Sequence, residues 1–223
     1  MTRADGDQRP NSLLTSDQVH SFWDRRHTTA SALRSGGDIG LSDQDNVIFY
    51  YIRLGLLLQA LAGLAPLPRY ATVLDAGCGK GWFSRKLAEA GYHVHGVDAS
   101  PTAIEYARQM NNGPHYEIAS LATVRPPRFV DAVVSVDVLF HVTDDSEWSA
   151  SVRNLAGTVL PGGSLVFSDT MASTRRVLGT YIVHRPKDEY LGLLSPAGFE
   201  HRESLPYRFR SNALGMHVYR RAW

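Results

Sequence analysis

The stretch VLDAGCGKGWFS, residues 73–84, places three glycines directly after a short apolar run and ahead of a helical pattern. Gly77, Gly79 and Gly81 alternate there, and a residue without Cβ permits a tight turn and lets a ligand approach the main chain. Asp98 follows 21 positions after Gly77, at the end of the next predicted strand. A carboxylate at that place can accept hydrogen bonds from ribose hydroxyls, so the pair predicts a nucleoside-containing cofactor.

Two further residues bear on which cofactor this is. Trp82 stands where a dinucleotide fingerprint needs its third glycine or an alanine. Asp75, at the end of the preceding strand, adds a carboxylate that would repel a pyrophosphate. A cationic or zwitterionic ligand suits this turn better, and S-adenosyl-L-methionine is such a ligand.

From Thr72 onward, short β-rich runs alternate with helical patterns, which favours an α/β fold with a doubly wound, mostly parallel sheet. The predicted strands are 72–76, 93–98, 116–119, 131–140 and 164–170. A last helix is predicted within 184–199, and the runs 200–210 and 213–222 are expected to pair as a hairpin at the sheet edge.

Two helices are predicted ahead of this sheet, at 16–27 and 43–64, joined by a glycine-bearing loop at 31–42. The second is apolar nearly all round, so we expect it to be buried on two sides. The sequence therefore divides into a disordered polar tail (1–15), an N-terminal helical cap or lid (16–67) and a cofactor-binding catalytic domain (68–223).

Composition narrows the function classes. A formal net charge of +1 gives no general attraction to nucleic acid. One cysteine excludes an internal disulfide framework, and no run of eighteen uncharged apolar residues is present. The opening residues lack the apolar core of a signal peptide. We therefore expect a cytoplasmic protein with no membrane or nucleic-acid partner; its two-sided helix leaves a homodimer open.

Four stretches, in order, resemble the class I (Rossmann-like) S-adenosylmethionine-dependent methyltransferases: VLDAGCGKG (73–81), HVHGVDAS (93–100), DAVVSVDVLFHV (131–142) and LPGG (160–163). The resemblance spans residues 73–199 and implies a seven-stranded sheet. It implies that Asp75, Gly77, Cys78 and Gly79 line the methionine part of the cofactor, that Asp98 holds the ribose and that Ala99 flanks the adenine. Trp82, Ser100, Ser120 and Leu121 are expected to line the same site; Ser120 and Leu121 stand where the family often has an acidic residue.

Several other residues have two readings each. Asp137 interrupts an otherwise buried run near the carboxyl end of a strand, which favours a site residue. Arg53, on the apolar helix, either pairs with the cofactor carboxylate or extends its head into water. His141 follows the fourth strand and is either a general base or a histidine that orders its loop. Cys78 is expected to fill space instead of acting as a nucleophile.

The acceptor side of the site is expected to involve His184, Tyr51, Trp23 and His27. The alternative reading of His184 is a surface residue, and that of Trp23 is a hydrophobic anchor. His93 and His95 share one face of a strand, but no third ligand is evident, so no metal is predicted.

The sequence thus predicts methyl transfer by in-line displacement to an oxygen or nitrogen nucleophile of a small-molecule metabolite, such as a biosynthetic intermediate, with S-adenosyl-L-homocysteine as product. The alternatives are a non-catalytic S-adenosylmethionine-binding scaffold or regulator and a nicotinamide-dependent oxidoreductase.

Overall fold

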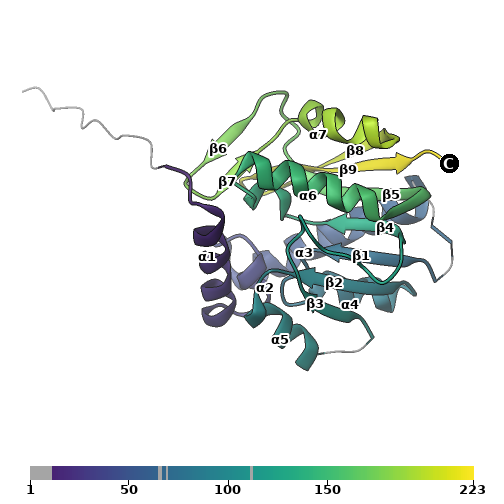
Figure 1. Ribbon diagram of the computed structural model, residues 1–223. Helices are drawn as coiled ribbons and strands as arrows, with labels where there is room; N and C mark the ends of the chain where they lie inside the picture. Colours follow the sequence, from purple (N-terminus) through teal and green to yellow (C-terminus); the bar gives the residue numbers. More distant parts are fainter. Residues whose placement is uncertain (1–11, 65–66, 69, 111–112) are drawn as a thin grey trace, which may run out of the picture.

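The computed structural model describes residues 12–64, 67–68, 70–110 and 113–223. Its centre is a seven-stranded sheet in the order β3-β2-β1-β4-β5-β9-β8 (Figure 1). The strands are β1 (Thr72–Ala76), β2 (His93–Asp98), β3 (His115–Ile118), β4 (Val130–Ser135), β5 (Val159–Asp169), β8 (Phe199–Phe209) and β9 (Asn212–Arg221). The pairings from β3 to β5 are parallel, and β5–β9 and β9–β8 are antiparallel. The predicted α/β class, the mostly parallel sheet and the edge hairpin are confirmed.

Helices cover both faces of this sheet. Side chains alternate along β1, so Leu74 points to one face and Val73 to the other. Leu74 packs in a core with α6 (Asp145–Thr158) and α7 (Lys187–Leu194). Val73 packs in a second core with α3 (Asp43–Gln59) and α4 (Trp82–Glu89). On the same face as α4, the buried residues of α5 (Pro101–Gln109) pack on Tyr116 of β3.

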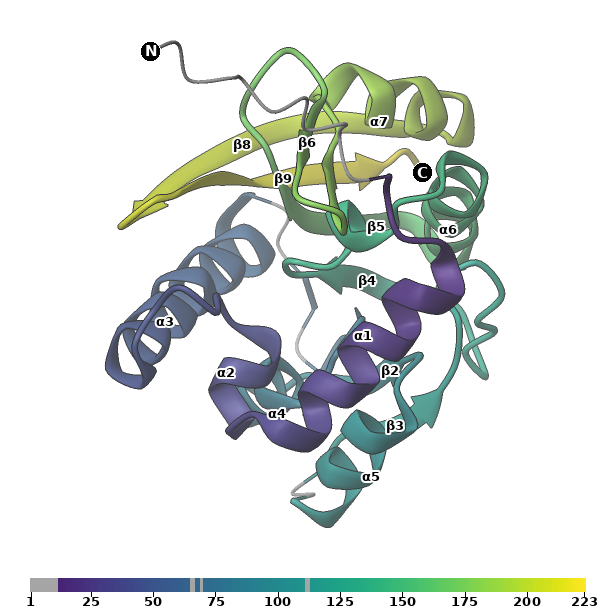
Figure 2. The same cartoon turned by 90° about the vertical axis from the view of Figure 1, so that its left-hand side faces the viewer.

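The first two helices lie at the edge of the sheet where the parallel strands end. Figure 1 shows α1 (Ser16–Thr29) beside this edge, and Figure 2, turned by 90°, shows it crossing in front of the strand ends. Thr15 and Gln18 form a capping box that fixes where α1 begins. The predicted glycine-bearing loop contains a short helix, α2 (Ala32–Gly36).

The helix α3 differs from the prediction in two ways. It packs against a face of the sheet as part of the second core, although the sequence analysis assigns it to the N-terminal cap. It is also buried on one side only, because Val47, Ile48 and Tyr51 are exposed. By length and composition, the segment Asp43–Gly63 is apolar enough to cross a membrane. In this fold, its inner face packs on the sheet.

The other departures from the predicted elements are local. The strand expected over 131–140 ends at Ser135, because Asp137 adopts a left-handed conformation (φ 57°) and a 3-10 turn, η2 (Leu139–His141), follows. Two short strands, β6 (Arg176–Leu178) and β7 (Ile182–His184), were not predicted. The remaining short elements are η1 (Ala60–Leu64) and η3 (Ser195–Ala197).

Candidate active site

The glycine turn after β1 forms the floor of a pocket at the carboxyl ends of the parallel strands. Gly77 has φ 82°, and a Cβ there would lie closer than 3.0 Å to the methyl carbons of Val138. Gly79 has φ 51°, and its missing Cβ faces His27 of α1 across the pocket. Both positions therefore require glycine, and the main chain at Gly79 is open to a ligand.

Asp98, at the end of β2, is held in place by backbone donors. The Gly79 N–H donates to Oδ2 at 2.8 Å, and the Ser100 N–H donates to Oδ1 at 2.9 Å. Each carboxylate oxygen can accept further hydrogen bonds, so Asp98 remains able to bind hydroxyl groups. The two contacts join the glycine turn to the beginning of α5, where Ser100 is the N-cap.

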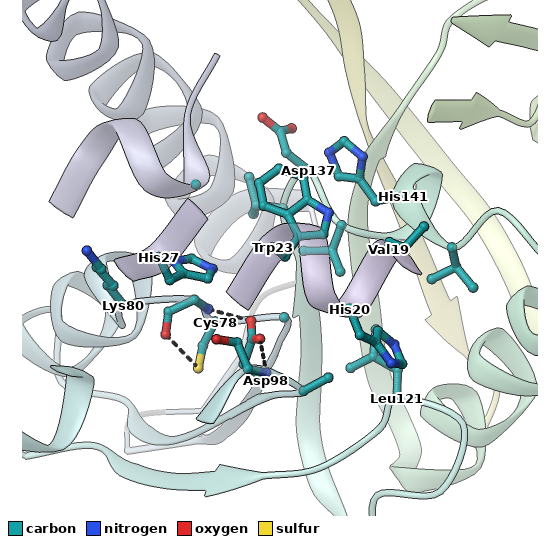
Figure 3. Close-up of a pocket in the computed structure, with 18 of the residues that line it drawn as sticks. Val19, His20, Trp23, His27, Cys78, Lys80, Asp98, Leu121, Asp137 and His141 are labelled. Carbon is teal, nitrogen blue, oxygen red and sulfur yellow. Dashed lines mark hydrogen bonds between the residues drawn. The ribbon is translucent and has the colours of Figure 1, made fainter. Parts of the chain in front are cut away.

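The pocket brings together most of the residues predicted from the sequence. Figure 3 shows Asp98 and Cys78 on one side of Trp23 and, on the other side, Asp137 and His141. The predicted residues that line it are Trp23, His27, Arg53, Gly77, Cys78, Gly79, Trp82, Asp98, Ala99, Ser100, Ser120, Leu121, Asp137 and His141.

Asp75 lies behind the glycine turn and is not among the residues that line the pocket. Its carboxyl is buried and accepts a hydrogen bond from the Ser84 hydroxyl at 2.5 Å. Burial raises its pKa to about 6, because desolvation penalises the charged form. Asp75 thus holds α4 against β1, and its contact with the methionine part of the cofactor stays a prediction.

Two of the residues predicted for the acceptor side also lie outside the pocket lining. Tyr51 is 55% exposed on α3 and contacts Trp82 edge-on. His184 is buried on β7, with Nδ1 2.7 Å from Oδ1 of Asp169. The Tyr190 hydroxyl donates to the other oxygen of that carboxylate at 2.6 Å. His184 is therefore part of a buried polar cluster and not a surface residue.

Arg53 and Asp137 form a buried ion pair at the back of the pocket. Nη1 of Arg53 donates to Oδ2 of Asp137, while its Nε donates to the Phe49 carbonyl at 3.2 Å. The Asp137 carboxylate also accepts from the hydroxyls of Ser168, at 2.6 Å, and Tyr207, at 3.2 Å. Nη2 of Arg53 is buried without a hydrogen-bond partner. Because an unsatisfied buried donor is costly, Nη2 marks a place for an acceptor.

His141 lies on η2 with its ring between aromatic neighbours. Its ring centroid is 4.6 Å from that of Trp23, and its Nδ1 is 3.0 Å from the Tyr181 carbonyl oxygen. A carbonyl only accepts, so Nδ1 carries the proton and Nε2 keeps its lone pair. Desolvation lowers the pKa of His141 to about 4. The imidazole is therefore neutral at physiological pH.

Cys78 has the chemistry of a space-filling residue. It is buried between the glycines, and desolvation raises the pKa of its thiol well above the usual value. The thiolate, the reactive form, is therefore scarce. The structure thus agrees with the expectation that Cys78 is not a nucleophile.

Helix α1 is joined by hydrogen bonds to the beginnings of α5 and α6, on two sides of the pocket. Near its middle, Asp24 accepts from the Ser100 hydroxyl at 2.6 Å and from the Thr102 N–H at 3.2 Å. At its beginning, the Ser16 hydroxyl donates to Glu147 of α6. These tethers hold α1 beside the pocket, with His27 next to Gly79 of the glycine turn.

The sequence analysis did not single out several residues of this site. Asp24 and Glu147 act through contacts with distant segments, so no local pattern marks them. Lys80, within the glycine turn, lines the pocket, and its Nζ donates to the Ala30 carbonyl at 3.1 Å. A lysine among three glycines was a signal that could have been used.

Comparisons with known proteins agree with this geometry. Residues 73–163 match the family model described as a methyltransferase domain. The ubiquinone biosynthesis O-methyltransferase of Alkalilimnicola ehrlichii is 32% identical over 66% of this chain and 58% of its own length. The malonyl-[acyl-carrier protein] O-methyltransferase of Serratia marcescens is 34% identical over 48% of this chain and 41% of its own length. The chain thus spans about half the length of these two relatives.

The solved structure of magnesium protoporphyrin IX methyltransferase from Synechocystis PCC 6803, with bound SAM, superposes with a TM-score of 0.74 at 21% identity. It covers 96% of this chain and 100% of the neighbour, so the fold is shared over its whole extent. The sheet order, glycine turn and Asp98 define an α/β nucleoside-binding domain of the Rossmann-like type. Residues 73–163 thus carry a methyltransferase domain, and the fold is that of the class I S-adenosylmethionine-dependent methyltransferases.

Proposed function

We propose that this protein binds S-adenosyl-L-methionine and transfers its methyl group to an oxygen or nitrogen nucleophile of a small-molecule metabolite, leaving S-adenosyl-L-homocysteine. The observation that carries the proposal is the unpartnered, buried Nη2 of Arg53 in the pocket that also holds Asp98. Nη2 of Arg53 is suited to bind a carboxylate, and the Asp98 carboxylate is suited to bind a ribose. A ligand that carries both chemical groups satisfies both residues.

The residues present fit this cofactor. Asp98 would accept hydrogen bonds from the ribose hydroxyls, and Ala99, Ser100, Ser120 and Leu121 would surround the adenosine. Nη2 of Arg53 would donate to the carboxylate of the amino-acid part, and Asp137 beside it would attract the ammonium. The main chain at Gly77, Cys78 and Gly79 would form the floor, with Trp82 beside it. A zwitterion therefore meets a buried pair of opposite charges.

The bound cofactor supplies a methyl group on a positively charged sulfur. The protein mainly aligns the acceptor with that group and excludes water, and such alignment is worth about 7–11 kcal/mol in well-oriented reactions. Trp23 and His27 of α1 would form the wall on the acceptor side, and Trp23 offers an aromatic face to a cation. Tyr51 and His184 lie outside the lining and would affect the acceptor only through their neighbours.

His141 is the residue in this pocket best suited to take a proton from an acceptor hydroxyl. Its Nε2 lone pair is free because Nδ1 donates to the Tyr181 carbonyl. As the acceptor oxygen forms its bond to the methyl carbon and the carbon–sulfur bond breaks, its proton would pass to Nε2. A pKa of about 4 makes His141 a weak base in the closed site, so an acceptor with an acidic hydroxyl suits it best.

Three findings support oxygen as the acceptor atom and a small molecule as the acceptor. Both curated relatives named above are O-methyltransferases. Helix α1 lies across the pocket, which suits a small molecule better than a nucleic acid. The near-neutral charge of the chain points the same way. We infer a cytoplasmic enzyme, acting away from membranes, and a homodimer would use the exposed apolar side chains Val47, Ile48 and Tyr51 of α3.

The test is a transfer assay with cofactor that carries a labelled methyl group. Purified protein is incubated with this cofactor and the small-molecule fraction of a cell extract, and label is followed into a new product by mass spectrometry. We expect transfer that depends on the protein and is lost in Asp98→Asn. Cofactor binding without any transfer would favour the scaffold or regulator, and binding of a reduced nicotinamide nucleotide instead would favour the oxidoreductase. Light scattering of the purified protein would show whether it is a dimer.

A further inference from the structure

A second hollow lies away from the cofactor pocket, among the amino-terminal parts of β1, β2 and β3. It has a volume of about 550 Å³ and is lined, among others, by Thr72, His93, His95, His115 and Arg128. The residues that line it and those that line the cofactor pocket form separate sets within the described chain. Whatever this hollow binds, the proposed methyl transfer does not use it directly.

Three metal-binding side chains converge beside this hollow. His95 of β2 stands directly opposite His115 of β3 in the strand register, and Val97 stands opposite Glu117. Because side chains alternate along a strand, His115 and Glu117 share one face, and His95 lies on that same face. One ligand atom from each of the three side chains lies within 4.8 Å of the others. Figure 1 shows the two strands side by side, with β3 at the edge of the sheet.

The buried ring of His95 is a separate observation that points to a ligand at this cluster. Its side chain is 8% exposed, and Nε2 has no hydrogen-bond partner of acceptable geometry although it is 3.1 Å from Oε2 of Glu117. A buried nitrogen of this kind requires an explanation, and a ligand atom awaiting a metal is one.

We propose that His95, His115 and Glu117 bind one divalent transition-metal ion, with zinc as the best match. Two imidazole nitrogens and a carboxylate oxygen form a common zinc set, and bonds of about 2.0–2.2 Å place such ligands about 3.3 Å apart. The His95–Glu117 separation is already close to that value. His115 is exposed and Glu117 is 42% exposed, so both side chains can turn to close the set. The fourth position is left to water.

The effect of the metal on the fold follows from the position of its ligands. One ligand comes from β2 and two come from β3, so the ion would fasten the edge strand to its neighbour. The alternative explanation is an ion pair between a protonated His95 and Glu117, and this pair does not need His115. Dependence of metal binding on His115 therefore separates the two explanations.

The experiment uses the full chain without a polyhistidine tag, titrated with zinc against a chromophoric chelator and with Co²⁺ followed by its visible absorption. We expect one zinc ion per chain. His115→Asn and Glu117→Gln should each weaken binding by at least about 10–100-fold, which is the loss typical of removing even an outer partner of a metal ligand. His95→Asn should do the same, and circular dichroism shows whether this buried variant is folded.

His93→Asn is the matched control, because His93 lines the same hollow but is not one of the three ligands. It should keep the zinc affinity of the unaltered protein, and all four variants should keep their affinity for S-adenosylhomocysteine. Zinc binding that is absent, or that is unchanged in both His115→Asn and Glu117→Gln, would overturn the proposal. Neither result would bear on methyl transfer.

Discussion

Replacing Arg53 by lysine tests how the pocket recognises the amino-acid part of the cofactor. A lysine keeps a positive charge for the buried Asp137 carboxylate, so the ion pair survives. It lacks the second nitrogen of the guanidinium fork, and Nη2 is the atom without a partner in the structure. Arg53→Lys therefore removes Nη2, together with the Nε hydrogen bond to the Phe49 carbonyl, while leaving the local charge unchanged.

The expected magnitude follows from the kind of hydrogen bond that is lost. A hydrogen bond to a charged group contributes about 1.5–3 kcal/mol. Its loss in Arg53→Lys should make the dissociation constant of S-adenosylhomocysteine roughly 10- to 150-fold larger. Calorimetry with S-adenosylhomocysteine measures this loss. Methylthioadenosine, which has the adenosine but no amino-acid part, is the control ligand, and its affinity should not change in Arg53→Lys.

Asp98→Asn provides the complementary control. It should weaken S-adenosylhomocysteine and methylthioadenosine alike, because both ligands carry the ribose. The reasoning is refuted if Arg53→Lys binds S-adenosylhomocysteine as tightly as the unaltered protein does. It is equally refuted if that variant loses affinity for methylthioadenosine by the same factor.

Three further predictions concern helix α1, the glycine turn and His141. Asp24→Ala removes the acceptor of the Ser100 hydroxyl and so loosens α1 beside the pocket. S-adenosylhomocysteine should therefore dissociate faster from this variant in stopped-flow experiments. Asp17→Ala, on the same helix, is the control and should leave the dissociation rate unchanged. Gly77→Ala should lower the free energy of unfolding in urea by more than about 1–3 kcal/mol, because backbone strain and a clash with Val138 both destabilise the variant. Gly91→Ala is the control, because Gly91 has φ 99° and open space around it and should show the backbone strain alone. Equal losses in the two variants would show that the clash with Val138 does not contribute. His141 should titrate near pH 4 by NMR. Because the unfolded chain binds this proton first, the free energy of unfolding should fall as the pH drops below about 6.5 and should level off below about 4. An NMR titration of His141 near pH 6.5 would contradict the burial of its ring.

The elements that the sequence predicted well are those set by local patterns. The bounds of β1 and β2 match the prediction, because each is a short apolar run that ends at a turn residue. The glycine turn and Asp98 were found for the same reason, since their spacing along the chain is itself the signal. The resemblance to a family extended this reasoning to the adenosine side of the pocket.

What the sequence could not predict depends on contacts between distant segments. Arg53 is 84 residues from Asp137 and Asp24 is 76 residues from Ser100, so neither pairing leaves a mark on local sequence. The one-sided burial of α3 could not be foreseen either, because its composition is apolar all round. The early end of β4 arises from the left-handed backbone of Asp137, which an apolar run does not reveal.

The metal cluster shows the same limit. His93 and His95 are visible as a pair in the sequence, yet the partners of His95 come from the next strand. Only the register between β2 and β3 brings them together.

The most direct test of the central claim is a calorimetric titration of the purified protein with S-adenosylhomocysteine, alongside Asp98→Asn. The account predicts saturable binding of one ligand per chain and a clear loss of affinity in the variant. Absence of binding heat, or the same affinity in both proteins, would contradict the assignment of this pocket to a nucleoside cofactor.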